Sequence, residues 1–238
     1  MAIHHGKKGG LWRWFWRIFV VLLLAFLLVQ GWFFWQVWQL RTEHPTTTAF
    51  MRERLALVRA VNPRAALRQQ WVAYDAIAPV LKRAVVASED DRFMQHHGFD
   101  WTGIQEALQK NWAEGEYAAG GSTISQQLAR NLFLTPDKTL WRKGEEAIIT
   151  VMLEATLSKR RILELYLNVV EWGDLLYGIG AASAYYFHKP ASALSSSEAA
   201  LLAAMLPNPR FYQDNLGARG LNRRASSIAA RMNRSEIP

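Results

Sequence analysis

An apolar stretch near the start of the chain limits what this protein can fold into. It runs from Ile18 to Leu40 without a charged side chain, and its most polar residues are Gln30, Gln36 and Gln39. At about 1.5 Å per residue, such a helix reaches roughly 34 Å, enough to cross the roughly 30 Å hydrocarbon layer of a membrane. The sequence therefore predicts a transmembrane helix over residues 18–40.

Tryptophans and charges around this stretch predict its orientation. Indole rings favour the headgroup region, and they cluster near both ends of the span: Trp12, Trp14, Trp16, Trp32, Trp35 and Trp38. Four basic residues precede the span and one closely follows it: Lys7, Lys8, Arg13, Arg17 and then Arg41. Because basic residues favour the cytoplasmic side, residues 1–17 are expected to form a cytoplasmic tail, with the remainder outside. A cleaved signal peptide is the alternative, although the stretch is long and lacks an A-x-A-like end.

Net charge and cysteine content limit the kinds of ligand and of chemistry that this chain can support. The net charge is +8, and the four basic residues before the span supply half of it. The remaining positive charge suits an anionic membrane surface or a phosphate-bearing ligand, whereas the exported topology puts nucleic acid out of reach. The chain has no cysteine, which excludes disulfides, thiolate catalysis and Cys-type zinc sites.

The rest of the chain is expected to be mainly α-helical. Residues 41–70 are interpreted as a linker and connector, helical over Ala49–Arg68 with an interruption at Pro63, and residues 71–238 as the compact domain. The domain is expected to begin with an extended segment, Trp71–Tyr74. Apolar residues then recur at spacings of three and four, which predicts helices over Ile77–Ser88, Trp101–Trp112, Thr123–Phe133, Lys143–Ser158, Ile162–Val170 and Ser196–Met205.

The densest polar cluster lies between Ser88 and Asp100. It follows an apolar helical run, so Glu89 and Asp90 are expected where a buried element meets a cleft or solvent. Partial desolvation raises the pKa of a carboxylate, which suits a general base. For a Glu-Asp pair in isolation, ordinary helix-end charges are the more common interpretation.

A second cluster runs from Gly120 to Asn131. Glycines followed by a Ser/Thr cap place free backbone N–H groups at a helix start, which favours anions, and polar side chains follow on the helix. The segment is no P-loop, because the Gly-Lys-Ser/Thr element is missing. A capped structural helix is the alternative.

Two further clusters follow. Arg142, Lys143 and Glu146 fall within one helical turn, where an exposed ion pair worth a few tenths of a kcal/mol is the plain alternative. The segment from Arg161 to Phe187 is mostly apolar and is expected to be scaffold: a helix, a glycine turn and another helix.

Together these segments resemble glycosyltransferase family 51, the peptidoglycan polymerases. The family pattern E-D-x-x-F-x-x-H-x-G-x-D is matched at Glu89, Asp90, Phe93, His96, Gly98 and Asp100, and the other motifs begin at Gly120, Arg142, Ile162 and Ser197. The resemblance covers about residues 71–210. Two positions depart from it: Arg130 stands where the family usually has lysine, and Lys138 where some members have arginine. Both departures keep the charge, but the two side chains bind phosphate with different geometry.

The resemblance implies a lysozyme-like helical domain and an inverting transfer. In this interpretation a sugar hydroxyl of lipid II attacks the anomeric carbon of the growing strand and polyprenyl diphosphate leaves. The resemblance assigns Glu89 as the base and Glu146 as the second catalytic carboxylate. It assigns substrate binding to Asp90, Ser122, Thr123, Gln126, Gln127, Arg130, Asn131, Arg142 and Lys143. It assigns structural roles to Phe93, His96, Gly98 and Asn168, although Asp90 and His96 are both expected to shape the turn.

The same resemblance implies the surroundings of the enzyme. The chain is expected in the bacterial inner membrane with its domain in the periplasm, in contact with lipid II and the glycan strand. Other cell-wall synthesis and division proteins are candidate partners. From its own composition, the apolar, glycine-flanked stretch Trp112–Gly120 is a candidate membrane contact. No cofactor is obligatory, but Mg²⁺ or Mn²⁺ at the diphosphate is compatible with the pattern. His96 and His97 lack a third ligand for zinc.

Three other functions compete with this interpretation. A lytic transglycosylase would cleave the same polymer with one or two carboxylates, but it has no use for the cations that suit a diphosphate. A noncatalytic anchored scaffold would need no base. Peptide cross-linking is not expected, because the sequence contains no S-x-x-K and no K-T-G, and insensitivity to β-lactams follows.

Overall fold

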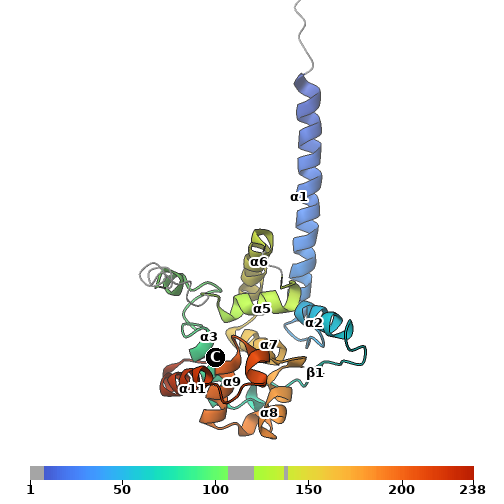
Figure 1. Cartoon of the computed structure of the whole chain (residues 1–238). Helices are drawn as coiled ribbons and strands as arrows, with labels where there is room; N and C mark the ends of the chain where they lie inside the picture. The colour runs from blue at the N-terminus through green and yellow to red at the C-terminus, as the bar shows by residue number, and fades with distance from the viewer. Residues whose placement is uncertain (1–7, 107–120, 137–138) are drawn as a thin grey trace, which may run out of the picture.

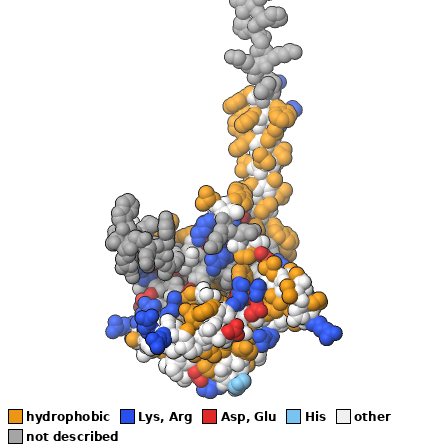
Figure 2. Space-filling model, viewed as in Figure 1, with side chains coloured by type: hydrophobic (Ala, Val, Ile, Leu, Met, Phe, Trp, Pro, Cys, Tyr) orange, Lys and Arg blue, Asp and Glu red, His pale blue; other side chains and the backbone are white. Residues whose placement is uncertain are grey.

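The computed structural model describes residues 8–106, 121–136 and 139–238, and it shows a long helix standing on a helical body (Figure 1). The helix, α1 (Lys8–Gln39), includes a stretch, Trp12–Gln39, that is long and apolar enough to cross a membrane, and an apolar 18-residue window within it is not buried by the protein. α1 begins ten residues before the expected start at Ile18 and includes Gly9 and Gly10 in its first turn. Apolar side chains cover most of the face of α1 that is visible in Figure 2.

The last turns of α1 pack on the body. Val37 and Leu40 are buried, and the rings of Phe33 and Phe133 meet edge to face. Beyond them, the guanidinium of Arg161 donates hydrogen bonds to the backbone oxygens of Leu40 (2.8 Å) and Glu43 (2.6 Å). The exit from α1 is therefore fixed to the folded domain.

The segment expected as a connector also belongs to the body. Its helix, α2 (Ala49–Arg59), begins at Thr48, whose hydroxyl accepts a hydrogen bond from the backbone of Met51. It ends nine residues before the expected Arg68, because Pro63 disfavours helical geometry at the residue before it and the chain turns ahead of that point. α2 packs against α5, and Arg54 forms a 2.7 Å ion pair with Asp174.

The body confirms the mainly α-helical prediction. Five helices correspond to expected ones within a few residues: α3 (Pro79–Glu89), α5 (Ile124–Phe133), α6 (Leu140–Thr156), α7 (Lys159–Val169) and α9 (Ser196–Met205). The expected helix from Trp101 is helical through residue 106, and its second half lies outside the described residues. The remaining helical elements are α8 (Ile179–Phe187), α10 (Pro209–Gln213), α11 (Arg219–Arg231) and the short η1 (Tyr74–Ala76), η2 (Ala191–Ala193) and η3 (Met232–Arg234).

A small sheet replaces the expected glycine turn. Its strand order is β1-β3-β2, where β1 is Arg68–Gln69, β2 is Glu171–Gly173 and β3 is Leu176–Tyr177. β1 pairs parallel to β3, and β2 pairs antiparallel to it. Gly178 ends this unit at φ +75°, and a Cβ there would lie 2.6 Å from the backbone oxygen of Asn168. Only glycine fits at that position.

The core centres on α7 and α9. Most of α7 is fully buried, including Leu163, Tyr166 and Asn168, and it packs on α5. α9 packs between α3 and α11, which explains why its sequence is apolar on nearly every face. These contacts bring the end of α3 and the start of α5 together.

Candidate active site

Glu89 is the last residue of α3, and its carboxylate is bound on both oxygens. Oε1 accepts a hydrogen bond from the hydroxyl of Ser88 at 3.0 Å, and Oε2 accepts one from the side-chain amide of Gln127 at 3.0 Å. The guanidinium of Arg224, on α11, lies 3.8 Å from Oε1. The side chain is 12% exposed, so it is partly desolvated but open to a ligand on one side.

Gln127 connects Glu89 to the core. While its amide nitrogen donates to Glu89, its amide oxygen accepts a 2.9 Å hydrogen bond from the hydroxyl of Tyr166. Burial raises the pKa of Tyr166 well above its ordinary value, and the negative charge of Glu89 acts in the same direction. Tyr166 therefore stays a hydrogen-bond donor, and it fixes which end of the amide faces Glu89.

Asp90 uses both of its carboxylate oxygens for hydrogen bonds within the protein. One of its oxygens bonds Nε2 of His96 at 2.8 Å, and the other accepts from the backbone N–H of Ile124 at 2.9 Å. Its side chain is 2% exposed. Asp90 thus joins the turn after α3 to the start of α5, and His96 secures it, with Phe93 fully buried beneath. Asp90 and His96 therefore bond to each other within the turn after α3.

Two other polar residues of the second cluster are also internal. Thr123 and Gln126 form a reciprocal capping box at the start of α5, and the Thr123 hydroxyl donates to the backbone oxygen of Gly98 at 2.7 Å. Both side chains are buried. Gly98 itself adopts φ +91°, a conformation that favours glycine. Ser122, one residue before the cap, remains accessible and lines a hollow beside Glu89.

Arg142, Lys143 and Glu146 form one cluster on the first turns of α6. Glu146 is buried, and its two oxygens bind the guanidinium of Arg142 at 2.7 Å and the ammonium of Lys143. Thr139 caps the helix by accepting from the backbone of Arg142, so α6 begins three residues before the expected Lys143. Glu146 therefore holds two cations in place.

A hollow of about 500 Å³ lies on the α5 side of Glu89. Arginines from three separate elements line it together with two side chains of the second cluster: Arg130, Arg142, Arg210, Gln127 and Asn131. Arg210 bonds the buried Glu171 at 3.2 Å. Burial raises the pKa of Glu171 above its ordinary value, and the nearby Arg210 offsets only part of this increase. The hollow offers more positive than negative charge, which suits a phosphate-bearing group.

A second hollow, of about 390 Å³, contains Glu89 itself. Ser122 and Gly121 lie on one side of it, and Arg231 of α11 lies on another. Lys and Arg side chains gather over α11 in the space-filling view (Figure 2). The structure therefore brings the predicted base, the α5 start and the α6 cations into one region, which also includes α11.

Asn168 holds the scaffold under this region. Its side chain bonds both the backbone N–H (2.7 Å) and the backbone oxygen (2.9 Å) of Val72, and also the backbone oxygen of Glu164. It is fully buried. Its contacts are those of a structural residue.

The sequence interpretation missed Tyr166, Glu171, Arg210 and the arginines of α11. Tyr166 lies in a motif that was taken as scaffold. For α11 a signal was present, because apolar residues recur at helical spacing through Leu221, Ala225, Ile228 and Met232. Glu171 and Arg210 carry no pattern of their own, since only the fold brings them together.

The described residues do not offer a metal site made by the protein. Within residues 8–106, 121–136 and 139–238, no three His, Cys, Asp or Glu side chains are placed to hold an ion. His96 is already bonded to Asp90. Two positions with expected roles, Gly120 and Lys138, lie outside the described residues.

Comparison with known proteins places this geometry in a family. The family model described as Transglycosylase matches residues 56–233. The chain belongs to the transglycosylase family. It is therefore a glycosyltransferase with the lysozyme-like helical domain that the sequence predicted. The match begins within α2, which agrees with the packing of that helix on the body.

Curated relatives of this transglycosylase are similar over nearly their whole length. A protein of Laribacter hongkongensis is 54% identical over 95% of this chain and 99% of its own length. Proteins of Chromobacterium violaceum (54% identical, 93% and 97% covered) and Methylobacillus flagellatus (52%, 94% and 98%) are similar to the same extent. All three are named biosynthetic peptidoglycan transglycosylase.

Proposed function

We propose that this transglycosylase polymerises lipid II into peptidoglycan strands for the bacterial cell wall, with inversion at the anomeric carbon. The observation that carries the proposal is the position of Glu89. It lies in one hollow and bonds Gln127, which lines a second hollow with Arg130, Arg142 and Arg210. A base beside a diphosphate-binding pocket is what this transfer needs.

In the proposed reaction, Glu89 takes the proton of the 4-hydroxyl of the incoming lipid-linked disaccharide. The oxygen forms a bond to the anomeric carbon of the growing strand, the bond from that carbon to the diphosphate breaks, and polyprenyl diphosphate leaves. Arg130, Arg142 and Lys143 stabilise the charge on the leaving diphosphate. Ser122 and Asn131 would contact the substrates, and Glu146 would orient Arg142 and Lys143.

The internal contacts change the roles proposed for several residues. The polar atoms of three side chains form hydrogen bonds within the turn and the α5 cap: Asp90, Thr123 and Gln126. We propose that these residues position the site and do not bind substrate. Gln127 is proposed to orient Glu89. A Mg²⁺ or Mn²⁺ ion would bind as a complex with the diphosphate of the substrate.

The setting is proposed from α1. A helix of this length and composition suits a single crossing of the inner membrane, with residues 1–17 in the cytoplasm and the domain in the periplasm. Substrate and product tails lie in the bilayer, so an anchor there raises the effective concentration of the enzyme. Other cell-wall synthesis and division proteins remain proposed partners, and peptide cross-linking is not expected.

Incubation with labelled lipid-linked disaccharide-peptide tests the proposal. The full chain should convert the label to polymer, and Glu89→Gln should lower the rate at least ~100-fold while the unfolding midpoint stays the same. Asp75→Asn is the matched control, because Asp75 is highly exposed and pairs with Arg160 at the surface. Unchanged polymerisation by Glu89→Gln would refute the base. Release of soluble fragments from finished peptidoglycan would favour a lytic enzyme.

A further inference from the structure

α11 and the short turn after it carry positive charge without any negative charge. Between residues 215 and 235 the sequence has no acidic residue and five arginines: Arg219, Arg223, Arg224, Arg231 and Arg234. These five side chains, here called the basic strip, are all exposed. They belong to the blue surface that gathers over α11 in Figure 2.

The fold of α11 does not depend on the basic strip. Leu221 and Ile228 are buried, and the helix packs on α9. Arg219 lies in the first turn, where the helix dipole favours acidic side chains, and that turn has none. Among the residues that the structure describes, Arg224 is the one arginine of the strip within ion-pair distance of a carboxylate, that of Glu89. The other four arginines are therefore available to an anion.

Two arginines of the strip border the hollow that contains Glu89. The guanidinium of Arg224 lies 3.8 Å from Oε1 of Glu89, and Arg231 lines the hollow. The two arginines are seven residues apart, so they share one face of the helix, about 10.5 Å apart along its axis. Ser227 lies between them on this face and is exposed. The strip therefore offers positive charge along two helical turns beside the proposed base.

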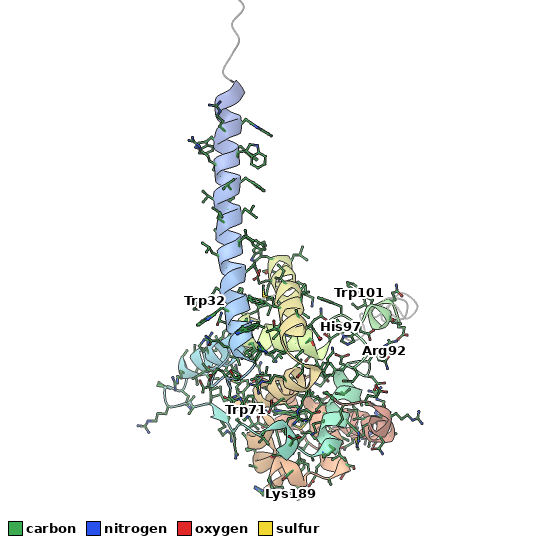
Figure 3. The ribbon with its side chains drawn as sticks, turned by 180° about the vertical axis from the view of Figure 1, so that it is seen from behind. Trp32, Trp71, Arg92, His97, Trp101 and Lys189 are labelled. Carbon is green, nitrogen blue, oxygen red and sulfur yellow. The ribbon has the colours of Figure 1, made fainter. Side chains whose placement is uncertain are left out.

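α11 lies in the part of the body that is farther from the free length of α1. In Figure 1, α6 and α5 lie closer to the level of that free length than α11 does. Figure 3 shows the same order from behind, with Trp101 above the red α11. The diphosphate of a lipid-linked sugar stays near the bilayer, because its tail lies in the hydrocarbon layer. An anion at the strip would therefore be a different part of the substrate.

The substrate of the proposed reaction has such a second anionic part. In lipid II a peptide is attached through its amino end to the sugar whose anomeric carbon reacts, so the peptide ends in a carboxylate. That carbon must lie within about 6 Å of the Glu89 carboxylate if this base is to act on the attacking hydroxyl. Each extended residue adds about 3.3–3.6 Å, so about three residues cover the distance between Arg224 and Arg231.

We propose that the basic strip binds the carboxylates of the substrate's peptide, with Arg231 at its centre. A guanidinium binds a carboxylate through two parallel hydrogen bonds, which suits this ligand. The inference rests on the proposed function and extends it, because the site would recognise the peptide as well as the diphosphate. Binding at the strip would hold the reacting sugar beside Glu89 through a part of the substrate that does not react.

Two lipid-linked substrates that differ only at the end of the peptide test the strip. One ends in a carboxylate and the other in a carboxamide. In the full chain, Arg231→Glu should raise KM for the carboxylate substrate about tenfold and change KM for the carboxamide by less than about twofold, because repulsion acts only on the charged ligand. Arg231→Lys keeps the charge and should restore most of the affinity.

The readout is the ratio of the two KM values, since any effect of the variant on Glu89 acts on both substrates alike. Arg64→Glu is the matched control, because it makes the same charge change at an exposed arginine in the turn after α2. It should leave the ratio as in the parent. A ratio that is also unchanged in Arg231→Glu would overturn the proposal.

A reporter on the strip tests binding without turnover. The chain has no cysteine, so Ser227→Cys gives a single site for a trifluoromethyl tag in the full-length protein. A soluble muramyl peptide with a free carboxylate should shift the fluorine resonance, and its carboxamide should need at least about a threefold higher concentration. The same tag at Val61→Cys, an 89% exposed position, should not respond.

A polyprenyl diphosphate without a peptide separates the two sources of negative charge. It should leave the tag at position 227 unshifted. A shift with this lipid and none with the muramyl peptide would assign the strip to diphosphates and overturn the proposal.

The reporter also separates the strip from the proposed reaction. If no polymer forms but the tag responds to the carboxylate peptide, the strip stands and the proposed reaction does not. If polymer forms but the tag does not respond, the reverse holds.

Discussion

Tyr166 and Glu89 are joined through a single side chain, the amide of Gln127. The hydroxyl of Tyr166 bonds the amide oxygen at 2.9 Å, and the amide nitrogen bonds Glu89 at 3.0 Å. If the amide turned over, its oxygen would face the carboxylate of Glu89, which only accepts hydrogen bonds, so the bond to Glu89 would be lost. The orientation of the proposed base is thus set from the centre of α7.

Replacing Tyr166 by phenylalanine should lower kcat about tenfold with little change in KM, because the amide of Gln127 would lose its fixed orientation. The loss of one buried hydrogen bond should cost about 1 kcal/mol of stability. Steady-state polymerisation rates and urea unfolding measure the two effects.

Tyr186→Phe provides the control for this prediction. Tyr186 also donates one hydrogen bond, to the backbone oxygen of Trp172 at 2.8 Å, but it does not contact Glu89 or Gln127. It should show a similar loss of stability with normal kcat. Equal kinetics in the two variants would contradict the orienting role of Tyr166.

Replacing Glu146 by glutamine should raise KM for the lipid-linked substrate about tenfold. Arg142 and Lys143 would lose the carboxylate that holds them, so their positions would spread while their charges remain. Losing a charged hydrogen-bond partner should also cost about 2 kcal/mol of stability. Glu154→Gln is the control on the same helix, since Glu154 pairs with Lys159 at 2.8 Å. A normal KM in Glu146→Gln would argue against this role.

Replacing Asn168 by alanine should destabilise the domain by about 3 kcal/mol, because the partly buried backbone N–H and oxygen of Val72 would lose their partners. Chemical denaturation followed by circular dichroism measures the change. Asn215→Ala, which removes an exposed hydrogen bond to Phe211, should stay within about 0.5 kcal/mol of the parent. A loss as small in Asn168→Ala would show that the segment before α3 is held by other contacts.

Glu198 should make part of the folding stability dependent on pH. Lys189, together with the backbone and hydroxyl of Ser195, lowers the pKa of Glu198 from 4.5 to about 2. Because the folded state favours the ionised form, this contribution is present above about pH 4.5 and is lost as the pH falls towards 2. The difference in unfolding midpoint between the parent and Glu198→Gln should therefore be constant near neutral pH and shrink below 4.5. A difference that does not vary with pH would contradict the shift.

Local signals in the sequence sufficed for most of the helices. The caps at Thr123 and Ser195 are capping boxes, and the helices that they begin start where the polar-to-apolar pattern changes. The sequence also identified the segments that carry Glu89, Arg130 and Arg142, because each segment matches a motif and the motifs occur in the expected order.

The parts that escaped prediction depend on contacts between distant segments. Asp90 was expected both in the turn and at the substrate, and only the backbone N–H of Ile124, far along the chain, shows where its second oxygen goes. Likewise, no local pattern in Glu171 or Arg210 indicates that the two side chains meet. A short strand such as β1 has no periodicity to detect, because it consists of two residues.

That short strand has a practical consequence for making the domain without its membrane helix. A chain cut at the predicted boundary, residue 71, would lack β1 and leave one side of β3 with unpaired backbone groups, a template for association between molecules. It would also lose α2 and the ion pair between Arg54 and Asp174. A version that starts at Thr48 keeps all three, so it should remain monodisperse where the shorter one precipitates.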